Sequence, residues 1–151
     1  MRRRLRRSLL WFGTGVIVVV GLAAVLVPHC LDAVQRSIVR RTLGEIHVLA
    51  SALEAYRAKY GVYPAHHGRQ RAQVCSVALV PEFLSRLPDR DVWAFPYYVV
   101  VTPDHYEVWS FGADGAPGPN LRDGPTDDWN SDILFSDGQL QRFPRGVVAQ
   151  P

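Results

Sequence analysis

The chain has 151 residues, of which 48% are hydrophobic, and a formal net charge of +3. Five of its basic residues lie at the extreme N-terminus, so residues 8–151 together carry 3 − 5 = −2 (Arg2, Arg3, Arg4, Arg6 and Arg7). The body of the chain has no stripe of basic residues interleaved with aromatic ones, which argues against nucleic acid as a partner. Beyond an apolar N-terminal segment, the length allows one compact domain.

That apolar segment runs from Leu9 to Val27, 19 residues without a charge. A helix of this length is ~28 Å long, about the thickness of a bilayer's hydrocarbon core. Arginines precede the segment, whereas residues 28–35 carry only Asp32, so the positive-inside rule predicts a cytoplasmic N-terminus. We therefore expect residues 1–8 to form a basic leader, residues 9–27 a transmembrane helix and residues 28–151 an exported domain. A cleaved signal peptide is the alternative, but its apolar core is usually ~7–15 residues and no small-x-small site follows here.

Past Pro28, apolar residues recur at steps of three or four, which predicts an amphipathic helix. The stripe consists of Leu31, Val34, Ile38, Thr42, Ile46, Leu49, Leu53, Tyr56 and Tyr60. Gly61 suits a helix C-cap, and Pro64 prevents further helix. Because a lone proline kinks a helix whose neighbouring turns are favourable, we expect one helix from about Leu5 to Lys59.

The rest of the chain predicts short helical pieces followed by two β-hairpins. Val74–Leu79 and Pro81–Leu87 are expected to be helical. Two hairpins are expected from strand-like runs around a Thr-Pro-Asp turn and around an Asp-Gly turn, namely Tyr97–Val101 with Tyr106–Phe111 and Ile133–Phe135 with Gln139–Phe143. The pattern predicts an α+β fold, in which a long amphipathic helix is followed by two antiparallel hairpins.

A long acidic loop, residues 112–132, separates the hairpins. It contains five aspartates and few opposing charges: Asp114, Asp123, Asp127, Asp128 and Asp132, with Asn120, Asn130, Ser131 and Arg122. Calcium takes six to eight hard oxygen ligands of these kinds and would relieve the repulsion among the carboxylates. The alternative is a solvated loop with Asx turns. The spacing does not match an EF-hand, so residue types alone leave both interpretations open.

Other features do not predict catalysis. The chain has no nucleophile elbow, no phosphate-binding glycine motif and no acid/base pair at a convincing spacing, so neither an enzyme nor a small-molecule substrate is expected. The three tryptophans beyond the apolar segment are expected to pack in and around the core. Cys30 and Cys75 are expected to be free thiols.

Several ordered motifs resemble the major pseudopilin of type II secretion systems. They are Leu26-Val-Pro28, Ala52-Leu-Glu-Ala-Tyr56, Tyr63-Pro64, Leu87-Pro88, Asp91-Val-Trp-Ala-Phe-Pro-Tyr97 and Ser110-Phe-Gly-Ala-Asp-Gly115. The resemblance covers roughly residues 26–135. It implies a pilin-like fold, in which a long N-terminal helix packs on a small antiparallel sheet with a long acidic loop. It also implies a protein of the bacterial inner membrane with a periplasmic domain, whose partners are other pseudopilin or secretion-system subunits, including copies of itself.

The resemblance also implies calcium in the loop between the strands. The positions that match the family's metal ligands are Asp114 and either Asp127 or Asp128, and Asn130 and Asp132 are possible further ligands. Members of the family are cleaved after a glycine by a prepilin peptidase, and a glutamate just beyond the cut is thought to pair with the new N-terminal amine of a neighbouring subunit. Counting back from Pro28 places Arg6 at the cleavage position, Arg7 at the new N-terminus and Trp11 at the position of the glutamate. The cleavage motif is therefore degenerate in this chain.

Two functional hypotheses follow. The first is a structural pseudopilin-like subunit of a type II secretion machine or a related envelope machine, which joins a filament by helix packing without the intramembrane carboxylate. The second is a stand-alone membrane-tethered binding domain that keeps the pilin fold and does not polymerise.

Overall fold

The computed structural model describes residues 2–118, 124–126, 128, 129 and 131–144, and for residues 2–19, 23 and 25 it describes the backbone alone. One helix, α1, runs from Arg2 to Tyr60 with Pro28 inside it. The predicted single helix is confirmed. It ends as expected, since Gly61 adopts a positive φ of 82° and its N–H donates to the Arg57 carbonyl at 2.7 Å.

Backbone contacts divide the chain into two compact units, Met1–Gln35 and Arg36–Pro151. The first unit is helical over its described residues, and the exposed apolar side chains on it include Leu26, Val27, Leu31 and Val34. α1 is the one helix among the described residues that is long and apolar enough, by length and composition, to cross a membrane. These four side chains do not belong to the core cluster of the second unit.

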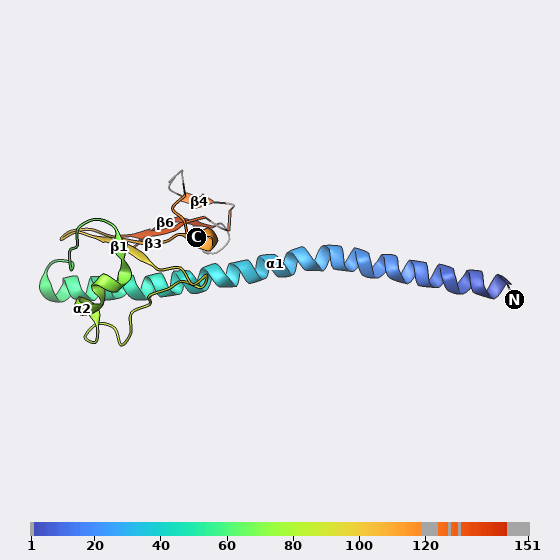
Figure 1. Ribbon diagram of the computed structural model, residues 1–151, viewed down its shortest axis with the longest axis horizontal. Coiled ribbons are helices and arrows are strands. Elements are labelled where there is room, and N and C mark those ends of the chain that lie inside the picture. Colours follow the sequence, from blue (N-terminus) through green and yellow to red (C-terminus); the bar gives the residue numbers. More distant parts are fainter. Residues whose placement is uncertain (1, 119–123, 127, 130, 145–151) are drawn as a thin grey trace. The chain divides into compact units, whose positions relative to one another are not determined.

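The second unit has its core between the later part of α1 and a β-sheet, which lies along one side of the helix (Figure 1). From Val39 onward, α1 buries a stripe of side chains that are at most 7% exposed: Val39, Thr42, Leu43, Ile46, Leu49, Ala50, Ala52 and Leu53. This burial supplies the hydrophobic driving force, at roughly 25 cal/mol per Å² of apolar surface removed from water. At the polar edge of the interface, the Tyr97 hydroxyl donates to Glu45 at 2.8 Å.

The sheet has six strands in the order β1-β2-β3-β5-β6-β4. Their bounds are Gln70–Arg71 for β1, Tyr98–Val101 for β2, Tyr106–Ser110 for β3, Gly124–Thr126 for β4, Ile133–Ser136 for β5 and Gln139–Pro144 for β6. Side chains alternate between the faces, so Val99 and Val108, paired across β2 and β3, join the core with α1. Tyr98, Trp109, Phe111 and Leu134 form a second cluster.

Both predicted hairpins are present, and their turns are tied together. Asp137 and Gly138 have φ values of 45° and 82°, as a tight Asp-Gly turn requires. The Asp137 carboxylate accepts a hydrogen bond from the Tyr106 backbone at 3.0 Å and lies 2.5 Å from Nδ1 of His105. This hydrogen bond raises the pKa of His105 above its ordinary value.

The structure corrects three expectations. The sheet is mixed, because β4 runs parallel to β6 while every other pair is antiparallel. Residues 72–79 are helical, as the 3₁₀ turn Ala72–Cys75 and α2 (Ser76–Leu79), but Pro81–Leu87 forms turns, and Pro88 disfavours helix at the residue before it. Leu31 and Val34 are 60% and 52% exposed, so the buried stripe begins later than predicted.

Leu49 and Leu53 are 1% and 0% exposed at the centre of the interface. We expect Leu49→Asp or Leu53→Asp to unfold the second unit, because an unpaired buried carboxylate costs several kcal/mol, about as much as many domains have in total stability. Thermal unfolding of the full chain in detergent micelles, followed by near-ultraviolet circular dichroism, measures this loss.

Val48→Asp is the matched control, since Val48 is 47% exposed on the same helix. It should keep a cooperative transition close to that of the unaltered chain. A cooperative transition in either leucine variant would contradict the orientation assigned to α1.

Candidate functional site

The acidic loop is anchored at its start by a buried carboxylate, Asp91. Its Oδ1 accepts hydrogen bonds from the backbone of Trp93 at 3.0 Å and Phe95 at 2.9 Å, and its Oδ2 accepts one from the Ser110 hydroxyl at 2.7 Å. Burial raises the pKa of Asp91, and these three donors oppose that rise. Asp91 therefore joins the turn before β2 to the last residue of β3, where the loop begins.

A 3₁₀ turn, Gly112–Asp114, follows β3 directly. Gly115 closes it with a φ of +64°, and a Cβ atom there would come within 2.4 Å of the Phe95 ring. Only glycine meets both conditions, because other residues adopt this φ at a cost and carry the Cβ. The Gly-Ala-Asp-Gly segment is thus packed against the same turn that Asp91 organises.

The two described aspartates that matter most here have different environments. Asp114 is exposed, and its Oδ1 accepts a hydrogen bond from the Ala116 backbone at 3.1 Å, which is an Asx turn. Asp132 is 2% exposed, and its Oδ2 accepts one from the Gly118 backbone at 3.0 Å. Burial raises the pKa of Asp132, and the negative charge of Asp114 adds to the rise.

The far side of the loop is held by hydroxyl groups. The Ser131 hydroxyl donates to the Asp128 carbonyl at 3.0 Å, and its oxygen lies at hydrogen-bond distance, 3.1 Å, from Thr126 Oγ1. The Asp128 backbone N–H donates to Thr126 Oγ1 at 3.1 Å, and Asp128 itself is exposed. The predicted ligands Asp127 and Asn130 lie outside the described residues, as does Asp123.

The described part of the loop fits a hard cation in chemistry but supplies only part of a coordination sphere. Asp114 and Asp132 interact electrostatically, and carboxylate oxygens are ligands that calcium prefers, although the positive charges of Arg142 and Arg69 also act on Asp132. Across the described residues, no three His, Cys, Asp or Glu side chains converge as a metal site would require. The sequence could not single out Asp132 among five aspartates, since its burial depends on the Gly118 backbone 14 residues earlier.

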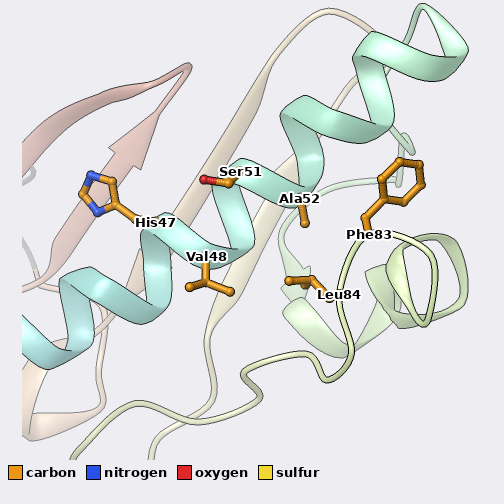
Figure 2. Close-up of a pocket in the computed structure, with 6 residues that line it drawn as sticks. All are labelled: His47, Val48, Ser51, Ala52, Phe83 and Leu84. Atoms are coloured by element: carbon orange, nitrogen blue, oxygen red, sulfur yellow. The ribbon is translucent and has the colours of Figure 1, made fainter.

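A shallow groove of about 320 Å³, separate from the acidic loop, lies between α1 and the segment that follows α2. It is lined by His47, Val48, Ser51 and Ala52 of α1 and by Phe83 and Leu84, and Figure 2 shows Val48 and Ala52 facing Leu84. The His47 ring donates from Nδ1 to the Leu43 carbonyl at 2.8 Å and packs on Phe135. The lining offers neither a carboxylate nor a thiol beside this histidine, so it lacks an acid/base pair.

Asp132 yields a test in the absence of metal. Its folded-state pKa lies above its unfolded value, so its contribution to stability is present at low pH and is lost as pH rises through the folded pKa. At pH 7 in chelator, Asp132→Asn removes a buried charge and keeps an oxygen for the Gly118 N–H. We expect the melting temperature to rise by roughly 2–5 °C at pH 7 and by less at pH 4.

Exposed Asp104 supplies the control, and Asp104→Asn should leave the melting temperature nearly unchanged at both pH values. A lower melting temperature for Asp132→Asn at pH 7 would show that the ionised carboxylate stabilises the loop without metal.

Comparison with known proteins agrees with this architecture. Residues 29–133 match the family of type II secretion system protein G. Type II secretion system core protein G of Pseudomonas aeruginosa is 28% identical over 127 residues, which cover 77% of this chain and 89% of that protein. The corresponding proteins of Pectobacterium carotovorum (29% over 128 residues; 78% and 80%) and Dickeya chrysanthemi (30% over 128 residues; 78% and 83%) are similarly related. The chain therefore belongs to the type II secretion system protein G family, and its role in type II secretion is the structural one of a pseudopilin.

Proposed function

We propose that this pseudopilin is a single-pass protein of the bacterial inner membrane that assembles with copies of itself and with other secretion-system subunits. Residues 9–27 cross the bilayer, the N-terminus is cytoplasmic, and residues 28–151 form a periplasmic domain. The charge asymmetry about the apolar segment supports this topology. The proposal assigns the chain no catalytic step and no small-molecule substrate.

The observation that carries assembly is the exposure of apolar residues on α1 beyond the proposed span. Leu31 and Val34 follow Pro28, so they lie outside the 19 uncharged residues, yet they are more than half exposed. Apolar side chains that are exposed on the helix just beyond the span are suited to pack against a neighbouring helix. Since Trp11 replaces the family's glutamate, assembly would rest on such packing and not on an intramembrane ion pair.

We also propose that calcium orders the acidic loop, with Asp114, Asp127 or Asp128, Asn130 and Asp132 as ligands. The buried carboxylate of Asp132 supports this, because a divalent cation would offset both its desolvation and its repulsion by Asp114. The stand-alone tethered domain is the less favoured alternative, because this chain matches secretion-system core proteins over most of those proteins' length.

Site-specific photo-crosslinking tests assembly. A photoreactive phenylalanine analogue at Leu31 or Val34, in cells that contain the whole secretion system, should give dimers and a ladder of higher species on denaturing gels. These positions would contact neighbouring helices in the assembled state.

Val77 is the matched control, because it is 92% exposed and apolar but lies on α2. The same analogue there should give far less of the ladder. Monomer alone at both α1 positions would favour the tethered, non-polymerising domain.

Calcium binding is tested by the melting temperature of the full chain in micelles with excess calcium and with chelator. At a free calcium concentration of about 100 times the dissociation constant, binding adds about 2.7 kcal/mol to the free energy of unfolding. We therefore expect the melting temperature to rise by on the order of 10 °C. Asp132→Asn and Asp114→Ala should abolish most of the shift.

Asp104→Ala, an exposed aspartate on the β2–β3 turn, should retain the full calcium shift. An equal melting temperature with calcium and chelator in the unaltered chain would reduce the loop to solvated Asx turns.

A further inference from the structure

The start of α1 concentrates positive charge next to the proposed membrane span. Arg2, Arg3, Arg4, Arg6 and Arg7 all belong to the helix, and the first acidic residue of the chain is Asp32. At ~1.5 Å rise per residue, these positions lie between ~3 and ~10 Å before Leu9, where the uncharged stretch begins. All five are therefore within about one Debye length of the surface at which the span enters the bilayer.

The five positions also surround much of the helix. At 100° per residue they cover about 200° of its circumference, with Leu5 and Ser8 on the remaining side. Tilting the helix in either direction thus keeps some of these positions near the surface. Such a distribution is suited to a plane of charge, whereas a single acidic protein groove would need the arginines on one narrow face.

The opposite end of the span differs. Residues 28–35 contain no arginine or lysine, and the next basic residues are Arg36, Arg40 and Arg41. They lie ~14–21 Å beyond Val27 along the helix, farther than the ~8–10 Å over which charges act at physiological salt. Positive charge is therefore within reach of headgroups at one membrane surface only.

We infer that the arginine-rich first two turns of α1 bind the phosphate groups of anionic phospholipids at the membrane surface where the span begins. A guanidinium group donates paired hydrogen bonds to phosphate oxygens, and clusters of four to eight basic residues beside a transmembrane helix gather anionic lipids. The segment selects lipids around the subunit as well as orienting it. This inference depends on the membrane span proposed above.

Trp11, the third residue of the uncharged stretch, is a built-in reporter. The full chain is placed in vesicles that contain brominated phosphatidylglycerol or, at the same mole fraction, brominated phosphatidylcholine. Subtracting the signal of the Trp11→Phe chain isolates the fluorescence of Trp11. We expect about threefold preferential quenching by the anionic lipid, weakened in 0.5 M salt.

Arginine-to-glutamine replacement at positions 2, 3, 4, 6 and 7 should bring the ratio of quenching by phosphatidylglycerol to quenching by phosphatidylcholine close to one. The matched control, Arg36→Gln with Arg40→Gln and Arg41→Gln, should keep the preference of the unaltered chain. Equal quenching by both lipids in the unaltered chain, or a preference that survives the five replacements, would overturn the inference while leaving the span intact. Absence of quenching by either lipid would instead overturn the span, and the inference with it.

Discussion

The contact between the later part of α1 and the sheet is the interaction on which the second unit depends. The strands are two to six residues long, and a small sheet of this kind gains its stability by burying one apolar face. Ile46, Leu49 and Leu53 supply that layer, and Val99 and Val108 meet them from the sheet. Neither part has an alternative way to bury its apolar face within the described chain, so helix and sheet fold together.

Because only the later part of α1 packs on the sheet, the helix has an exposed part and a covered part. Leu26, Val27, Leu31 and Val34, which precede Val39, are more than half exposed, whereas from Val39 onward one face of the helix is covered by the chain's own sheet. The acidic loop is attached to the sheet side through Asp91 and Ser110 at the end of β3 and through Asp132 at the start of β5. The loop's ends are thus fixed by buried hydrogen bonds, and its charge is presented between them.

Local pattern predicted the elements with strong periodicity or turn chemistry, namely α1, both hairpins and the Asp-Gly turn. It missed β1 and β4, because neither Gln70–Arg71 nor Gly124–Thr126 has the composition of a strand, and each exists only by pairing with a longer neighbour. The burial of Asp132 was equally hidden, since it arises from distant backbone. Family resemblance, carried by motifs such as that around Asp91, identified the fold more securely than periodicity alone.

The two edge strands of the sheet, β1 and β4, are poorly suited to pair with strands of other molecules. β1 has two residues, one of them an arginine, and β4 has three, with Pro125 unable to donate a backbone hydrogen bond. Long, regular edges invite strands from other molecules and lead to amyloid-like growth, whereas short or proline-bearing edges resist it. Edges of this kind therefore discourage copies of this chain from associating sheet to sheet.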